Sequence, residues 1–279
     1  MSIDGGGQRH RVDWGRSLLA GLNPGLSGQV GAFRRARAGV PSTARGRTVA
    51  VIGRLPGSGT STVAALLALA AAGYTDNRVT VVETNRAGGR GRSVTELLGG
   101  SGDGRLPALL TVPDGEAVAR RRVRSAGTPG AAVPVLALPA DAGSFAPQVL
   151  EQTLTRLRHR ADLTIIDTPS DRGEPVFHAV LHLVDQVVLV LTADRSAPAR
   201  LDAARRWLSS APGPARHHSV CVALVAVDRL VPRWRPGDLP WVLVPRDRAL
   251  RNGLPGRMSR RALTAGLELV RTVSDVRRG

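Results

Sequence analysis

The chain has 279 residues, of which 42% are apolar and 22% are charged, a composition typical of a globular protein that can bury a core. It carries 39 basic residues against 22 acidic ones, a formal net charge of +17, and every one of those basic residues is an arginine. This composition excludes a disordered tail, and the longest apolar runs have only about half the length of a membrane-spanning helix.

The single cysteine, Cys221, excludes a disulfide framework and suits a reducing compartment. The first residues contain no apolar stretch fit for export, so we expect a cytoplasmic protein without a signal peptide. Codon usage in a GC-rich genome accounts for arginine in place of lysine but not for the excess of bases over acids. That excess favours an anionic partner, which would be nucleic acid, an acidic protein or anionic lipid.

Residues 1–46 differ from the rest of the chain. They are rich in glycine, carry the basic cluster Arg34–Arg37 and have only short apolar patches around Trp14–Leu22. This pattern predicts a loosely attached N-terminal arm over residues 1–46, followed by one folded domain over residues 47–279.

Strand-like and helix-like segments alternate from Thr48 onward. Apolar, β-branched runs predict strands at Thr48–Gly53, Arg78–Thr84, Pro134–Pro139, Leu163–Pro169, Gln186–Ala193, Val220–Asp228 and Trp241–Pro245. Apolar residues three and four apart predict helices at Thr62–Gly73, Phe145–Arg160, Glu174–Asp185, Pro198–Ser209 and Ser259–Asp275. Residues 99–130 predict a loop-rich insertion with one short helix. The alternation predicts an α/β fold, with a mainly parallel sheet of about seven strands and helices on both faces.

The loop after the first predicted strand is the most informative segment. It reads Arg54-Leu55-Pro56-Gly57-Ser58-Gly59-Thr60-Ser61-Thr62 and leads directly into a helix. Such a loop directs backbone N–H groups at one point, where the helix N-terminus adds a partial positive charge, so it favours a phosphate group. Ser61 or Thr62 would offer a hydroxyl to a phosphate-bound Mg²⁺. The alternative is a plain glycine turn that lets the helix pack tightly. The segment departs from the P-loop pattern at Arg54, in place of glycine, and at Thr60, in place of lysine.

Four segments, in this order, resemble the MinD/ParA family of deviant P-loop ATPases. The family's loop K-G-G-x-G-K-T-T aligns with Leu55–Thr62, which keeps two glycines but has Leu55 and Thr60 in place of both lysines. Glu83-Thr84-Asn85 stands where the family has D-x-D or D-x-N, Ile165-Ile166-Asp167-Thr168-Pro169 matches I-I-D-T-P, and Pro245-Arg246-Asp247 is similar to I-P-x-D. The likeness covers residues 48–275.

This resemblance implies a three-layer P-loop NTPase fold, a homodimer, and a site for ATP or ADP with Mg²⁺. It places Arg54, Gly57, Ser58, Gly59, Thr60, Ser61 and Thr62 at the phosphates, Ser61 and Asp167 at the Mg²⁺, Glu83 and Asp167 in catalysis, and Pro245 and Asp247 near the base. Without both lysines we expect weak or lost nucleotide binding and very slow or absent hydrolysis, because a single electrostatic donor contributes about 3 kcal/mol to transition-state stabilisation. Arg86, Arg90 and Arg92 follow the second strand and are further candidates to face the phosphates.

The arm carries a narrower likeness. Trp14, then Leu22-Asn23-Pro24-Gly25, then a basic helix leading to the loop, is similar to MinD-like ATPases associated with actinobacterial type VII secretion. The first interpretation is therefore a regulatory or scaffolding component of a secretion or positioning system, with a secretion or partition protein as its partner. The alternatives are a partition-type protein that binds DNA nonspecifically through arginines, and a working ATPase in which Arg54 replaces the lysine.

Other signals favour structural roles. His178 and His182 have a spacing that can hold zinc, but no third ligand is evident beside them. His217, His218 and Cys221 form a similar group, in which the cysteine opens a buried strand. The run Arg120–Arg124 is typical of a solvated face, with contact to an anionic partner as the alternative. We expect the last helix to pack on the sheet rather than to bind a membrane.

Overall fold

The computed structural model describes residues 45–53, 55–75, 77–84, 92–98, 133–137, 147–169, 175–210, 219–226, 234–253 and 257–275. Most of the predicted arm, the insertion at 99–130 and its arginine run lie outside these ranges. Within them, no helix is both long enough and apolar enough to cross a membrane.

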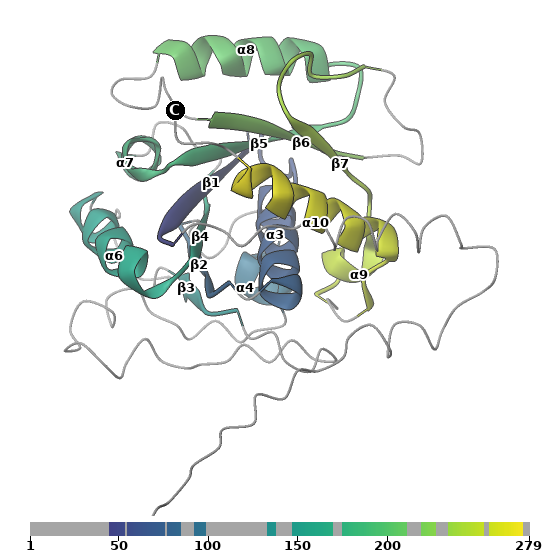
Figure 1. Ribbon diagram of the computed structural model, residues 1–279. Helices are drawn as coiled ribbons and strands as arrows, with labels where there is room; N and C mark the ends of the chain where they lie inside the picture. Colours follow the sequence, from purple (N-terminus) through teal and green to yellow (C-terminus); the bar gives the residue numbers. More distant parts are fainter. Residues whose placement is uncertain are drawn as a thin grey trace, which may run out of the picture.

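Seven strands form one sheet in the order β3-β2-β4-β1-β5-β6-β7, and every pair of neighbours is parallel (Figure 1). The strands are β1 (Arg47–Gly53), β2 (Val79–Glu83), β3 (Val135–Ala137), β4 (Leu163–Asp167), β5 (Gln186–Thr192), β6 (Ser219–Val225) and β7 (Trp241–Val244). Each coincides with a predicted strand. The predicted α/β fold with a parallel sheet is therefore confirmed.

Helices cover both faces of the sheet, because successive strand residues point to opposite sides. Val49 and Val51 of β1 face one side, and Ala50 and Ile52 face the other. The first side packs against α3 (Thr60–Tyr74), α4 (Val94–Leu97), α9 (Arg248–Arg251) and α10 (Arg260–Ser274), and the second against α6 (Pro147–Arg160), α7 (Pro175–Leu183) and α8 (Ala197–Ser210) (Figure 1).

The helices α3 and α10 pack side by side on one face of the sheet, with α3 against β1, β2 and β4 and α10 against β7. Residues Val63–Ala71 of α3 are all buried, as expected for a helix that is apolar on every side. Gly266 of α10 makes this packing close, since a Cβ atom there would lie 2.9 Å from Cβ of Ala70. The N-terminus of α3 is thereby fixed at the carboxyl ends of the strands, which is where α/β sheets bind their ligands.

Candidate functional site

The loop between β1 and α3 has the backbone of an anion-binding turn. Gly57 has φ 79° and Gly59 has φ 96°, both in the left-handed region that favours glycine. Gly59 caps α3, and no side chain bonds to this helix end. Among the described residues, the backbone N–H groups of Thr60, Ser61 and Thr62 find no acceptor. The start of α3 therefore presents three N–H donors and a partial positive charge to an incoming anion.

The threonine that replaces the P-loop lysine is turned inward, toward the loop itself. Its Oγ1 lies 3.1 Å from Oγ of Ser58, a hydrogen bond between two hydroxyl groups. Both hydroxyls lie over Gly53, where an added Cβ atom would come within 2.1 Å of Thr60 Oγ1 and 2.2 Å of Ser58 Oγ. Leu55, at the position of the family's other lysine, is 48% exposed. The described part of the loop thus carries hydroxyl groups and an apolar side chain, but no positive side chain.

The structure brings Ser61 and Asp167 together at the ends of neighbouring elements. Val51 of β1 pairs with Asp167 of β4, and Oγ of Ser61 donates a 2.7 Å hydrogen bond to Oδ2 of Asp167. Asp167 is fully buried, and its carbonyl oxygen accepts hydrogen bonds from both N–H and Oγ1 of Thr84. A hydroxyl beside a carboxylate is a donor set that Mg²⁺ accepts, so these two residues fit the metal that the fold implies.

Glu83 lies on the strand next to that of Asp167, but its carboxylate accepts hydrogen bonds from α4. It pairs with Asp167 in the register of β2 and β4. Its Oε1 accepts a bond from N–H of Val94 at 3.1 Å, and its Oε2 accepts bonds from N–H and Oγ1 of Thr95 at 3.4 and 2.8 Å. Burial raises the pKa of Glu83, and the bonds from Thr95 and Val94 partly offset that rise. In this structure its carboxylate holds the start of α4.

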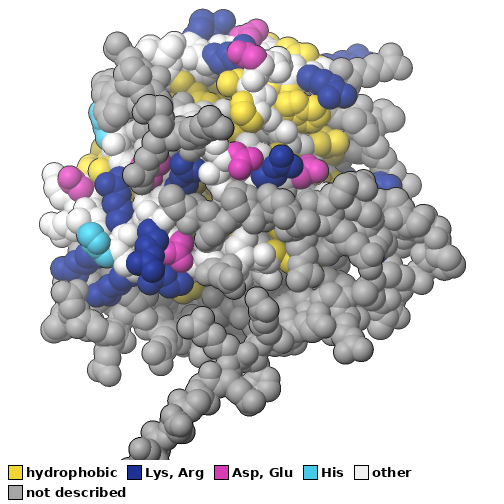
Figure 2. All heavy atoms as spheres, viewed as in Figure 1, with side chains coloured by type: hydrophobic (Ala, Val, Ile, Leu, Met, Phe, Trp, Pro, Cys, Tyr) yellow, Lys and Arg dark blue, Asp and Glu magenta, His cyan; other side chains and the backbone are white. Residues whose placement is uncertain are grey.

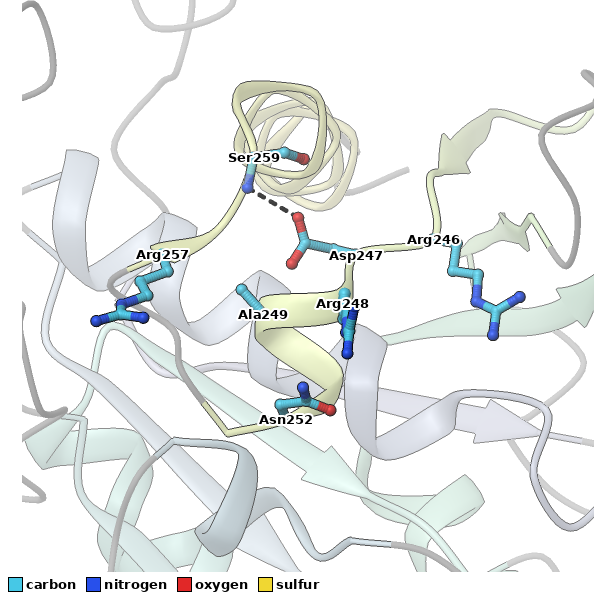
Figure 3. A pocket seen from close by; sticks show the side chains of 7 residues that line it. All are labelled: Arg246, Asp247, Arg248, Ala249, Asn252, Arg257 and Ser259. Atoms are coloured by element: carbon cyan, nitrogen blue, oxygen red, sulfur yellow. Dashed lines mark hydrogen bonds between the residues drawn. The ribbon is translucent and has the colours of Figure 1, made fainter. Parts of the chain in front are cut away.

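Asp247, predicted near the base, caps a short helix. Its Oδ1 accepts from N–H of Leu250 and its Oδ2 from N–H of Ser259, both at 2.8 Å, which joins α9 to the start of α10. A pocket of about 490 Å³ lies beside this junction (Figure 3). Its lining residues are Arg246, Asp247, Arg248, Ala249, Asn252, Arg257 and Ser259. The predicted Pro245 is half-buried and precedes this group without lining it.

Of the remaining predicted residues, the structure describes only Arg92. Arg54, Arg86 and Arg90 lie outside the described residues, as does Asn85. Arg92 donates from Nη1 to the carbonyl oxygen of Asn252, so it ties the segment before α4 to the end of α9.

No group of three metal-ligand side chains occurs among the described residues, His178 and His182 included. Cys221 is buried in β6, and burial raises the pKa of its thiol to about 12. It is a core residue, as predicted. His217 and His218 lie outside the described ranges.

Solved structures with the same arrangement of strands and helices identify the fold. A ParA family ATPase from Chlorobium tepidum matches with a TM-score of 0.60 and 15% identity, over 81% of this chain and 97% of that one. The MinD cell division protein from Aquifex aeolicus matches with a TM-score of 0.58 and 14% identity, over 79% and 94%. The fold is that of the MinD and ParA ATPases.

A third match is cobyrinic acid a,c-diamide synthase from Mycobacterium smegmatis, solved with an ATP analogue and magnesium. It has a TM-score of 0.52 and 21% identity, over 79% of this chain and 91% of that one. No protein-family model matches the sequence, and the comparison with curated proteins gave no match. The MinD/ParA-like architecture is thus evident from the structure, whereas the sequence identity to these proteins is too low for the two sequence comparisons to detect it.

Proposed function

We propose that this chain is a MinD/ParA-like nucleotide-binding protein. Residues Gly57–Thr62 would hold the phosphates of ATP or ADP through backbone N–H groups, and Ser61 with Asp167 would hold the Mg²⁺. The observation that carries the proposal is the N-terminus of α3, to which no side chain bonds, beside the 2.7 Å hydrogen bond between Ser61 and Asp167. Backbone donors at a helix N-terminus attract phosphate without any positive side chain.

We further propose that hydrolysis is very slow or lost. In a P-loop the lysine stabilises charge that moves onto the phosphate oxygens in the transition state. Thr60 supplies a hydroxyl that already bonds to Ser58, and Leu55 supplies no charge. Bound Mg²⁺ would supply electrostatic stabilisation of the phosphates, and Ser61 and Asp167 would orient it. A working ATPase would need Arg54 to take over the role of the lysine, although its planar fork differs from a compact ammonium group.

The test is calorimetric titration of the purified chain with ATP and ADP, with and without Mg²⁺, beside an assay of phosphate release. We expect Mg²⁺-dependent binding, weakened at least about tenfold by Asp167→Ala, because the metal would lose a charged ligand. Ser61→Ala should also weaken Mg²⁺-dependent binding, because the metal would lose a hydroxyl ligand, and Ser209→Ala, which removes a hydroxyl from the remote helix α8, is its matched control. Turnover near about 1 s⁻¹, abolished by Asp167→Ala, would refute the proposed loss of hydrolysis. Absence of any nucleotide binding would refute the site itself.

For the cellular role, we propose a regulatory or scaffolding component of type VII secretion or of a positioning system, acting in the cytoplasm as a homodimer with a protein partner. The support is the resemblance of the arm, around Trp14 and Leu22–Gly25, together with the fold. Affinity purification from the source cells tests it, with the chain lacking residues 1–46 as the control. Recovery of the same partners without the arm would contradict the part of the proposal that rests on it.

One observation favours nonspecific DNA binding as a second candidate. Arg45, Arg78 and Arg158 are exposed at the amino-terminal end of the sheet, and basic side chains gather around α6 on the face shown in Figure 2. Within this group Asp162 forms ion pairs with Arg45 and Arg78, and the first of these is long, at 3.9 Å. We expect DNA binding, if this surface provides it, to fall steeply with salt. The exchange Arg158→Gln should weaken it, whereas Arg206→Gln on α8 should not.

A further inference from the structure

The pocket beside α9 is lined mainly by charged and polar side chains. Ala249 is its one apolar lining residue, and three arginines line it: Arg246, Arg248 and Arg257. Pockets for uncharged ring systems are usually lined by apolar and aromatic side chains, and no aromatic side chain lines this one. Its volume of about 490 Å³ suits a small molecule or one end of a larger ligand. The lining therefore favours an anionic group.

The carboxylate of Asp247 offsets only one of the three arginine charges that line this pocket. Both oxygens of Asp247 accept backbone hydrogen bonds that hold α9 and the start of α10. Arg248 and Arg257 are exposed, and neither forms an ion pair with any described residue. Figure 3 shows Arg246 and Arg257 on opposite sides of α9, with Arg248 between them. Guanidinium groups match phosphate in geometry as well as in charge.

The pocket also lies next to the phosphate loop. A Cβ atom on Gly59 would contact Cγ2 of Val225 at 3.4 Å, so the loop lies over the end of β6. Val225 pairs with Val244, the last residue of β7, and the chain then enters the pocket lining at Arg246. Neighbouring strands are about 5 Å apart, so one strand spacing separates the loop from the start of the pocket. A ligand held at the loop by its 5′-phosphates is long enough to reach it.

We propose that this pocket binds a second phosphate group on the same ligand, so that the preferred ligand is a nucleotide phosphorylated both at the 5′ position and on the ribose. Arg248 and Arg257 bind this second phosphate, and Gly57–Thr62 bind the first. This inference rests on the proposed function, because it extends the ligand that the loop would hold. It assigns the arginines of the pocket to ligand selectivity.

The test compares ligands that differ in the number and placement of their phosphates; ATP and adenosine 5′-diphosphate 3′-phosphate carry three each, in different places. Calorimetric titrations use ADP, ATP and adenosine 5′-diphosphate 3′-phosphate, with GDP and guanosine 3′,5′-bis(diphosphate) as a second base. We expect the ribose-phosphorylated ligand to bind about tenfold more tightly than ADP, because it adds charge-assisted hydrogen bonds. ATP, which places its added phosphate at the other end, should not show this gain through the same arginines.

Amino-acid substitutions test which arginines cause the tighter binding of the ribose-phosphorylated ligand. The double exchange Arg248→Gln with Arg257→Gln should remove the preference for the ribose-phosphorylated ligand, while the affinity for ADP changes far less. Arg251→Gln is the matched control, because Arg251 is an exposed arginine of α9 that does not line the pocket. The single exchanges Arg248→Gln and Arg257→Gln each should remove part of the preference, and thermal melting checks that each variant is folded.

The outcomes separate the two proposals. If ADP binds and the ribose phosphate adds nothing, the inference is refuted and the nucleotide site stands. If none of the ligands binds, both are refuted. If Arg251→Gln lowers the preference as much as the pocket variants do, the gain comes from general positive charge and the pocket assignment is wrong.

Discussion

The exchange Thr60→Lys tests whether the phosphate loop is intact except for its missing charge. In the native chain, Oγ1 of Thr60 bonds to Oγ of Ser58 at 3.1 Å, over the close approach at Gly53. A lysine at this position loses that bond and extends from the first turn of α3 toward the point where its N–H groups converge. If the loop holds phosphates, the new ammonium group meets them.

The expected magnitude follows from two terms. A hydrogen bond to a charged group contributes about 1.5–3 kcal/mol, and immobilising a long side chain on binding costs about 0.5–1.5 kcal/mol. The midpoints of these ranges give a net gain in binding free energy of about 1 kcal/mol, which corresponds to about fivefold tighter binding of ATP or ADP. The lost bond between Thr60 and Ser58 acts on the free protein, where it should lower the free energy of unfolding by about 1 kcal/mol.

The assay is a titration of wild type and Thr60→Lys with Mg²⁺-ATP and Mg²⁺-ADP, combined with urea unfolding. Thr155→Lys on α6 is the control, because it makes the same chemical change at an exposed position remote from the loop. Equal tightening by the two exchanges would mean that general charge is responsible. No tightening by Thr60→Lys in a folded protein would refute the view that this loop holds phosphates.

Three further predictions concern stability and reactivity. Gly57→Ala should lower the free energy of unfolding by about 1–2 kcal/mol, because Gly57 has a φ of 79° and a Cβ atom there strains the backbone without meeting a neighbour. Gly73→Ala, in open space within α3, should raise the free energy of unfolding by up to about 1 kcal/mol. Urea unfolding compares the two variants, and a change of the same sign in both would refute the backbone argument. Burial raises the pKa of Glu83 in the folded state, so its contribution to stability should be present at low pH and should fall as the pH rises from about 4.5. Glu83→Gln should lose hydrogen bonds to α4, lower the free energy of unfolding by about 1–3 kcal/mol at pH 5 and remove this pH dependence. An unchanged pH profile would contradict the assignment. Cys221, whose buried thiol has a pKa of about 12, should resist thiol reagents at pH 8 until urea unfolds the chain, and rapid labelling of the native protein would contradict its place in the core.

The sheet could be predicted because its strands are buried on both faces. The segment Gln186–Thr192 contains the unbroken apolar run Val187–Leu191, and the structure places it between β1 and β6. The short helices α4 and α9 were missed, since four residues are too few to show a helical period. A local signal for α4 was nevertheless present. Ser93 and Glu96 form a capping box, which the pattern S-x-x-E encodes.

The candidate site, like the fold, has one part that the sequence predicted and another that it did not. That Ser61 and Asp167 would lie close together followed from the sequence, because both stand at the carboxyl ends of elements that meet at one edge of a parallel sheet. The partners of Glu83 did not follow, because they belong to the unrecognised helix α4. That Asp247 lies near a base stays a prediction; its bond to the start of α9 did not follow from the sequence either, because α9 was also unrecognised. A carboxylate at a strand end has competing local donors, and sequence order alone does not say which of them it accepts.

The retained and missing parts of the loop would act at different stages of a reaction. Backbone N–H groups at the start of α3, fixed by the left-handed glycines Gly57 and Gly59, would bind the phosphates of substrate and product alike if the proposed function holds. Such uniform binding lowers the dissociation constant without raising the rate, since only interactions that strengthen in the transition state accelerate the chemical step. The charged groups that strengthen there are the lysines, and this chain has Leu55 and Thr60 in their places. A loop of this kind separates binding from turnover, so the protein would respond to the presence of a nucleotide without consuming it. If it signals by occupancy, ligand selectivity has to come from groups outside the loop, and the arginines beside α9 are the described residues placed to provide it.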